Sequence, residues 1–175
     1  MKKVTRAIIL LMSLAMLFSL GCGDDDDDNG NKIVNPGGTT TTNSMKATIS
    51  GKYSVNFNAS IVVALKVNSV SALTITATQP VSGTNYSISL SLNVTQGTGT
   101  FPVGEDYTGV NDGTAMFNKT VDNETEMFYA NTGSVTITEM GTRIKGTFQF
   151  TATNLDGETV TIASGSFNAA LSTQE

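Results

Sequence analysis

The sequence of 175 residues contains no histidine and no tryptophan, and cysteine occurs only once. Without histidine the chain lacks the commonest general base and the commonest ligand of transition metals, which excludes zinc chemistry and serine–histidine catalysis. The absence of tryptophan removes the largest aromatic ring that could stack on a sugar. A single cysteine cannot form a disulfide within the chain, so folding must rest on the hydrophobic core alone.

Charged side chains are also scarce. They make up 14% of the residues, compared with about a quarter in typical soluble domains. The formal net charge is -5, and no basic patch follows residue 45 that could neutralise a row of phosphates. We therefore expect no nucleic-acid partner. Threonine, serine, asparagine and glycine are abundant instead, which predicts a solvent face that is largely neutral and rich in hydroxyl groups.

Residues 1–21 have the features of a secretory signal peptide. Lys2, Lys3 and Arg6 form a positively charged start, and residues 7–20 form an uncharged, mostly apolar run. This run is too short for a relaxed transmembrane helix, which needs about 20 apolar residues. We therefore expect the segment to direct export and then to be removed.

The apolar run ends in Leu-Phe-Ser-Leu-Gly-Cys, residues 17–22, which resembles a bacterial lipobox. The resemblance implies that Cys22 is acylated and becomes the new N-terminus, so that the partner of this end of the chain is a membrane. Several acyl chains on one residue hold far more firmly than a single chain, which would make the anchor permanent. Acylation would also remove the only thiol from any catalytic role.

Residues 22–44 are predicted to be a disordered tether between the anchor and a single domain at 45–175. Asp24 to Asp28 are five adjacent like charges that repel one another and resist folding. They are either a solvated spacer or, by resemblance, the export signal of Bacteroidota surface lipoproteins. The expected location is accordingly the outer membrane, with the domain facing the cell exterior or, alternatively, the periplasm.

The region from residue 45 onward alternates between apolar and polar positions. Between residues 86 and 94 every even position is apolar and every odd position is serine or asparagine, as on a half-buried strand. The same period recurs at 61–67, 73–77, 135–137 and 144–152. We therefore predict an all-β fold, an antiparallel β-sandwich or partly closed barrel of about 8–10 strands.

Three short segments predict where these strands turn or bend. Ser50-Gly51 and Asp156-Gly157 are each expected to form a two-residue hairpin turn between apolar arms. In the last segment the apolar positions change from even numbers, such as Val160, to odd numbers, such as Phe167. This change of parity predicts a β-bulge at Ser164-Gly165.

Three sequence blocks resemble a known family. They are Gly-Ser-Val-Thr-Ile-Thr at 133–138, Gly-Thr-Phe-Gln-Phe-Thr-Ala at 146–152 and Val-Thr-Ile-Ala-Ser-Gly-Ser-Phe at 160–167. These blocks resemble the C-terminal half of an uncharacterised Bacteroidota lipoprotein family. The resemblance implies an all-β domain behind a lipobox signal peptide, and it brings no known activity with it.

Carboxylates are the only catalytic groups that remain, and they could supply an acid and a base for glycoside cleavage. The candidates, which are also weak candidates for ligand or cation contacts, are Glu105, Asp106, Asp112, Asp122, Glu124 and Glu126, with Tyr107 as a ring beside the first two. A solvated loop or edge explains their pattern more simply. The loops at 111–114 and 154–158 are possible calcium ligands but are also ordinary turn sequences. We therefore predict no metal, no cofactor and no catalytic residue.

Three functions remain open. The first is a non-catalytic envelope protein whose β-domain binds or scaffolds a glycan or a protein outside the cytoplasm. The second is a carboxylate-dependent glycan hydrolase, which would need its acids to converge in one cleft. The third is a lipocalin-like carrier of a small apolar ligand, which a core filled by Ile88, Leu90, Phe148 and Phe150 would oppose.

Overall fold

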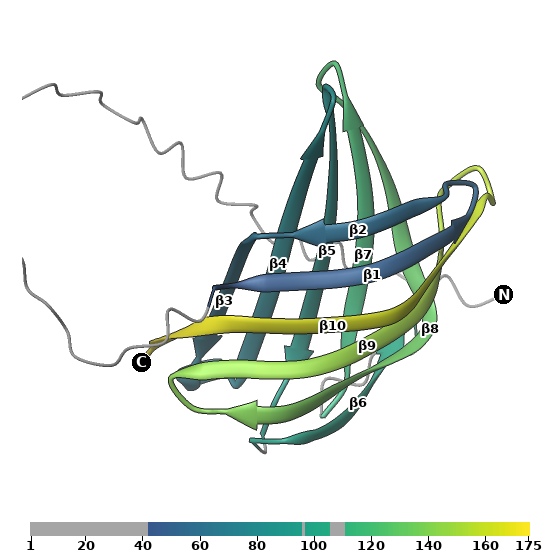
Figure 1. Cartoon of the computed structure of the whole chain (residues 1–175). Coiled ribbons are helices and arrows are strands. Elements are labelled where there is room, and N and C mark those ends of the chain that lie inside the picture. Colours follow the sequence, from purple (N-terminus) through teal and green to yellow (C-terminus); the bar gives the residue numbers. More distant parts are fainter. Residues whose placement is uncertain (1–41, 96, 106–110) are drawn as a thin grey trace, which may run out of the picture. The chain divides into compact units, whose positions relative to one another are not determined.

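A computed structural model of the chain describes residues 42–95, 97–105 and 111–175, all within one compact unit. The described residues form ten strands and one short 3-10 turn, η1 (Asn68–Val70) (Figure 1). The strands are β1 (Ser44–Gly51), β2 (Val55–Ala59), β3 (Ile61–Val67), β4 (Ala72–Val81), β5 (Thr84–Asn93), β6 (Gly99–Gly104), β7 (Gly113–Val121), β8 (Glu124–Met140), β9 (Arg143–Thr153) and β10 (Thr159–Gln174). In this part of the chain, no helix has the length and apolar character needed to cross a lipid bilayer.

The ten strands form one continuous sheet in the order β2-β1-β10-β3-β4-β5-β7-β6-β8-β9. The last strand in this order, β9, also pairs with β10, so the sheet closes on itself in a ring. This confirms the prediction of an all-β domain. The sheet is mixed rather than purely antiparallel, because β10 runs parallel to β3 and β6 meets β7 in a parallel bridge.

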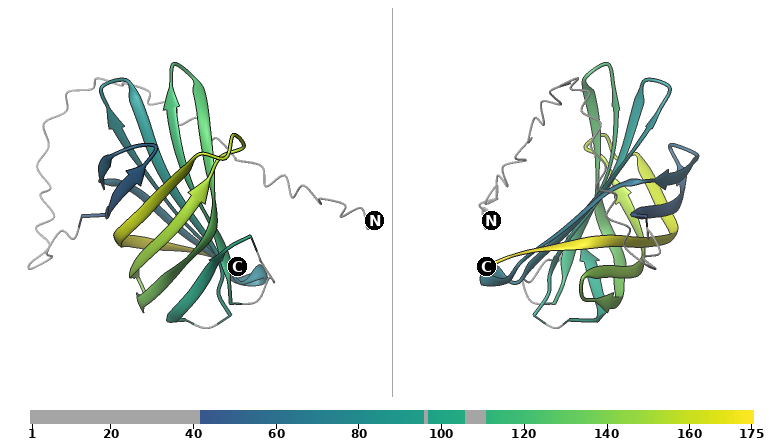
Figure 2. Two further views of the ribbon diagram at one scale, coloured as in Figure 1. Left: turned by 90° about the vertical axis from the view of Figure 1, so that its right-hand side faces the viewer. Right: turned by 60° about the vertical axis from the view of Figure 1, so that its left-hand side comes forward.

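Two walls of the ring run in crossing directions. Strands β4, β5 and β7 are steep in the view of Figure 1, whereas β1, β2, β9 and β10 run across them, and Figure 2 shows the same crossing from two other sides. The long strand β8 belongs to both walls, because its first part pairs with β7 and its later part with β6 and β9. Bulges bend it between Ala130 and Thr132 and between Ile137 and Glu139. Bulged long strands of this kind form the corners of closed sheets.

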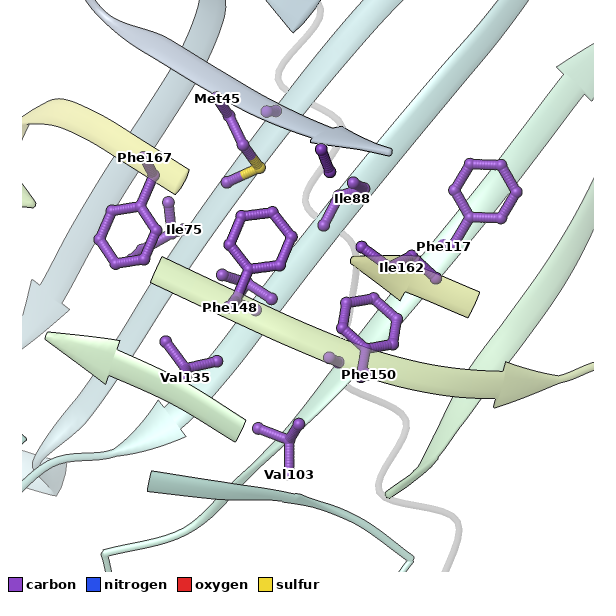
Figure 3. Packing of buried hydrophobic residues seen from close by; sticks show 14 of the residues in the cluster. Met45, Ile75, Ile88, Val103, Phe117, Val135, Phe148, Phe150, Ile162 and Phe167 are labelled. Carbon is purple, nitrogen blue, oxygen red and sulfur yellow. The ribbon is translucent and has the colours of Figure 1, made fainter. Parts of the chain in front are cut away.

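The interior is filled by the apolar side chains that alternate along each strand. Figure 3 labels ten of them, including Met45, Ile88, Phe148 and Phe167, pointing toward one another from different strands. The four residues proposed to fill the core are all buried: Ile88 and Leu90 are 0% exposed, and Phe148 and Phe150 are 3% exposed. The alternation in the sequence therefore identified the inward face of the strands correctly.

Three glycines let the aromatic rings of β9 and β10 pack against neighbouring strands. Gly133 lies opposite Phe150, Gly146 opposite Phe167, and Gly165 opposite Phe148. An added Cβ would lie 2.4, 2.1 and 2.5 Å from the nearest backbone oxygen at these glycines, respectively, so none has room for a side chain. The Phe148 ring lies between those of Phe150 and Phe167 and stacks on both, with centroids 6.3 Å apart in each pair. Gly146, Phe148 and Phe150 of the Gly-Thr-Phe-Gln-Phe block thus belong to an interlocked set of rings and glycines that spans β8, β9 and β10.

The β-bulge predicted at Ser164-Gly165 is confirmed by the shift in register between Ile162 and Gly165, and Ser164 has a φ of 52°. Both predicted two-residue turns were wrong, since each turn is wider. Strand β1 pairs with β2 only up to Ile49, opposite Val55, because Gly51 continues to pair with β10. The second turn likewise spans the five residues between Thr153 and Thr159, which pair with each other. Both wider turns end at one polar cluster.

Candidate functional site

The predicted carboxylates that lie in the described residues do not converge in one cleft. Asp112 precedes β7 and Asp122 follows it, so they lie at opposite ends of a nine-residue strand, about 30 Å apart at the usual rise per residue. Glu105 is exposed directly after β6. It lies at the same end of the sheet as Asp112, because Val103 of β6 pairs with Gly113 of β7. Cys22, Asp106 and Tyr107 lie outside the described residues.

Asp112 and the turn carboxylates have different surroundings. Asp112 is only 5% exposed, and its backbone carbonyl accepts a hydrogen bond from the backbone N–H of Asn93 at 2.8 Å. Asp122 is exposed in the turn between β7 and β8 and has a φ of 51°, and Glu124 is the exposed first residue of β8. Asparagine and aspartate tolerate this left-handed conformation better than most residues. Asp122 therefore occupies an exposed turn position that suits its backbone conformation.

Among the predicted carboxylates, Glu126 joins a cluster of functional groups from segments that are distant in the sequence. This cluster, which we call the Lys52 cluster, consists of Lys52 and Tyr53 from the β1–β2 turn, Glu126 from β8, and Asn154 and Glu158 from the β9–β10 turn. The Lys52 ammonium lies 2.5 Å from Glu126 Oε1 and also forms an ion pair with Glu158. The Tyr53 hydroxyl donates to Glu126 Oε2. Two turns and one strand that are distant in sequence are thus joined through two carboxylates.

Asn154 shapes the β9–β10 turn from within and is only 8% exposed. Its Oδ1 accepts hydrogen bonds from the amides of Asp156 at 3.1 Å and Glu158 at 2.8 Å. Its Nδ2 donates to Glu126 at 2.7 Å and to Glu158 at 2.8 Å. The possible calcium loop at 154–158 is therefore built as a turn, and its Glu158 carboxylate forms an ion pair with Lys52. Throughout the described ranges, no group of three or more acidic, histidine or cysteine side chains could hold a metal ion.

Aromatic rings connect the Lys52 cluster to the core. Tyr53 lies edge-on to Phe128, with ring centroids 6.0 Å apart, and the Lys119 ammonium lies 4.3 Å from the centroid of the Tyr53 ring. Cation–π contacts of this length are favourable. Next to them, Tyr86 stacks on Phe117 at 6.2 Å. Tyr53 is therefore held on one side by the core and on the other by a cation.

The electrostatics of the Lys52 cluster hold both carboxylates in the ionised form. Hydrogen bonds from Lys52 and then from Asn154 lower the pKa of Glu158. Partial burial would raise the pKa of Glu126, but hydrogen bonds from Lys52, Tyr53 and Asn154 together outweigh it and lower that pKa. The same bonds to Glu126 and Glu158 raise the pKa of Lys52. Burial, followed by the hydrogen bond to Glu126, raises the pKa of Tyr53.

A groove on the outer side of β8, β9 and β10 is the second candidate. We call it the outer groove, and its volume is about 400 Å³. Its lining consists of polar side chains together with Phe148 and Gly165. These polar side chains are Ser134, Thr136, Thr147, Gln149, Ser164 and Ser166. Ser134 pairs with Gln149 across the strands, and Thr136 pairs with Thr147, which in turn lies opposite Ser166. The lining contains no charged side chain.

A family model described as a domain of unknown function (DUF6252) matches residues 45–170. The chain belongs to this family. The match spans both the Lys52 cluster and the outer groove of the DUF6252 domain, and it confirms the prediction of an uncharacterised family. Neither the curated proteins nor the solved structures contain a significant match. The Bacteroidota source and the lipobox stay predictions.

The sequence interpretation missed most of both sites in the DUF6252 domain. Lys52 was not singled out as the partner of Glu126 and Glu158, because its contacts with them join positions 74 and 106 residues apart. The groove residues had a detectable signal, since they occupy the polar positions of three strands whose apolar positions were recognised. The bulge at Ser164-Gly165 was predicted, but the sequence interpretation did not predict that these two residues line a groove on the outer face.

Proposed function

We propose that this protein is a lipid-anchored component of the bacterial outer membrane whose DUF6252 domain binds a glycan or a protein without catalysing a reaction. The anchor is supported by the signal-like residues 1–21, the lipobox-like segment ending at Cys22 and the acidic, threonine-rich residues 22–44. Together these segments would hold the domain at a distance from the lipid headgroups.

The arrangement of the carboxylates is the observation that carries the non-catalytic part of the proposal. Glycoside hydrolysis needs one carboxyl group that keeps a proton near neutral pH and a second that is ionised. Glu126 and Glu158 do approach each other, but both bind the same ammonium and both have a lowered pKa. Neither is suited to be a general acid, and the other described candidates lie toward the ends of separate strands.

The filled interior supports binding at the outer surface over carriage of an apolar ligand within the ring. Phe148, Phe150 and Ile88 occupy the space between the walls (Figure 3), and each is at most 3% exposed. A carrier would need that space for its ligand. The carrier function therefore stays an alternative, but core side chains would have to be displaced before an apolar ligand could bind within the ring.

Location is tested by protease shaving of intact cells, with an epitope tag after Glu175 and lysed cells as the control. We expect the tag to be lost from intact cells, and Cys22→Ser to release the protein from the membrane fraction. Retention of the Cys22→Ser protein in that fraction would contradict the lipid anchor. Protection of the tag until lysis would indicate a domain that faces the periplasm.

Catalysis is tested by incubating the purified chain with a broad panel of polysaccharides and oligosaccharides and measuring new reducing ends. We expect no cleavage. Cleavage that disappears in both Glu126→Gln and Glu158→Gln, while the folded state persists by circular dichroism, would establish the hydrolase alternative instead.

A further inference from the structure

We propose that the outer groove of β8, β9 and β10 is the ligand site, and that it takes a neutral glycan. This inference rests on the proposed binding function and deepens it by naming a site and a ligand class. The groove is formed by the outward-facing residues of three adjacent strands, whereas the inward-facing residues of the same strands build the stacked phenylalanine core.

The chemistry of the lining matches a polyhydroxyl ligand. In the described part of the chain, no side-chain hydrogen bond engages the polar groups of five lining residues, which are Ser134, Thr147, Gln149, Ser164 and Ser166. Hydroxyl and amide side chains both donate and accept hydrogen bonds, as sugar hydroxyls do. Because no lining residue is charged, the groove offers no counter-charge for a phosphate or carboxylate ligand. A net charge of -5 also disfavours anionic ligands.

The neutral surface continues along β9 beyond the groove. The outward residues Thr147, Gln149, Thr151 and Thr153 succeed one another at every second position, and Thr153 pairs with Tyr129 of β8. The distance from Thr147 to Thr153 is about 20 Å at the usual rise of a strand. Tyr129 is 47% exposed and provides an aromatic face at the far end. The length and neutral character of this surface therefore suit an extended oligosaccharide with one sugar ring at Tyr129.

Charged side chains lie at the two ends of this neutral surface. The Lys52 cluster lies beyond Thr153, because Asn154 directly follows it. The ion pair of Lys145 with Glu139, at 2.6 Å, lies at the other end, two residues before Thr147. The ends of the surface are thus closed to a charged ligand by paired charges, while its middle stays neutral.

The backbone beneath the groove is held in place before any ligand arrives. Ser164 takes a left-handed φ of 52° within the bulge, a conformation that is uncommon for residues other than glycine. Bulges of this kind redirect side chains and occur often next to binding sites. Gly165 lies directly under the Phe148 ring, with an added Cβ only 2.6 Å from ring atoms. A preorganised backbone lowers the entropic cost of binding.

The outer face of β4 and β5 provides a matched comparison within the same molecule. It too is rich in hydroxyl groups, but Thr76 and Ser89 hydrogen-bond to each other at 3.0 Å. The neighbouring strand β3 exposes Ile61 and Val63, at 58% and 64%. These hydroxyls are already paired and lie beside apolar side chains, so Ser89→Ala is a suitable control for changes in the groove.

The test is a titration of the isotope-labelled full chain, observed by NMR, with neutral hexasaccharides of glucose, xylose, mannose and galactose, and with hexagalacturonate as the charged probe. We expect at least one neutral probe to bind and to shift the amide signals of Thr147, Gln149 and Ser166. The double variant Gln149→Ala with Ser166→Ala should weaken binding by about tenfold or more, as expected for two lost hydrogen bonds. Ser89→Ala should change the affinity by less than about twofold.

Three results would overturn the groove as a glycan site. They are no shift with any neutral probe at millimolar concentration, shifts confined to another surface, and tighter binding of hexagalacturonate than of every neutral probe. Binding at another surface would leave the proposed binding function intact. Cleavage of a probe would instead contradict the proposed non-catalytic function, so the two failures are distinguishable.

Discussion

The middle of β8, β9 and β10 and the turns at one end of these strands are neighbouring regions held by different forces. In the middle, three glycines and three phenylalanines interlock across strands with no charged side chain. At the end, Lys52, Glu126, Glu158 and Asn154 are joined by ion pairs and hydrogen bonds. The first arrangement depends on shape and the second on charge and hydrogen bonding.

This difference determines how each region should respond to mutation and to pH. Close packing leaves almost no room for added atoms, so the smallest addition is costly and pH has little influence. An exposed ion-pair network tolerates changes in shape, but it depends on the protonation of its members. We therefore expect the largest loss of stability from a change in the closely packed region and the smallest from an isolated surface ion pair.

Gly146→Ala should destabilise the protein by about 3 kcal/mol, as overpacking of a core does. The new Cβ would lie 2.1 Å from the Thr136 carbonyl oxygen and 2.5 Å from the Phe167 ring. Gly141→Ala is the control, because no atom lies within 4 Å of its added Cβ. Urea unfolding followed by circular dichroism measures both. Equal stabilities of the two variants would contradict the interlocked arrangement.

Asn154→Ala should cost about 2 kcal/mol, because it leaves the amides of Asp156 and Glu158 without their acceptor in a buried turn. Asn131→Ala is the matched control, since it removes one exposed hydrogen bond of 3.1 Å to Thr153. The control should change stability by less than about 0.5 kcal/mol. The stability of both variants is measured by thermal unfolding. Equal losses in the two variants would contradict a larger contribution from the buried hydrogen bonds of Asn154.

Glu126→Gln should cost about 1 kcal/mol at pH 7, and the cost should disappear in acid. The pKa of Glu126 is lowered in the folded state. Its stabilising contribution is therefore present above the ordinary pKa of 4.5 and is lost as the pH falls through the lowered pKa. Unfolding free energies of wild type and variant should converge once the pH falls below the lowered pKa of Glu126. A difference that stays constant from neutral pH into acid would show that Glu126 acts through packing.

Lys145→Gln should leave stability unchanged within about 0.5 kcal/mol, because isolated exposed ion pairs contribute little. The side chains of Lys145 and Glu139 are 42% and 52% exposed. A larger loss in chemical unfolding would show that the neutral middle of the sheet depends on the charges at its ends, which would weaken the contrast between the two regions.

Local pattern was sufficient to predict the inward face of the strands and the bulge at Ser164-Gly165, because both depend on a period of two residues along the chain. It was insufficient for the wider turns around Gly51 and Gly157. There, pairing of Gly51 with β10 and the hydrogen bonds of Asn154 override local turn preferences. The parallel pairing of β3 with β10 was also beyond prediction, because it joins segments that are far apart in the sequence.

The candidate sites also contain some features that the sequence predicted and others that it did not. Glu126 was noticed as a carboxylate, but its partners Lys52 and Tyr53 were not assigned to it, since 74 and 73 residues separate them. The absence of histidine and the single cysteine limit the possible chemistry through composition alone. The convergence of the Lys52 cluster and the hollow over the bulge required the closed sheet.

The sequence by itself determined the signal-like pattern of residues 1–21, the alternation of apolar and polar positions along the strands and the bulge at Ser164-Gly165, because each depends on neighbouring residues. Only the tertiary structure decided that the sheet closes, that Glu126 and Glu158 share one ammonium, and that the polar positions of β8, β9 and β10 line one groove. The physical reason is distance along the chain. Contacts between remote segments depend on the register of all the strands between them, which no local pattern specifies.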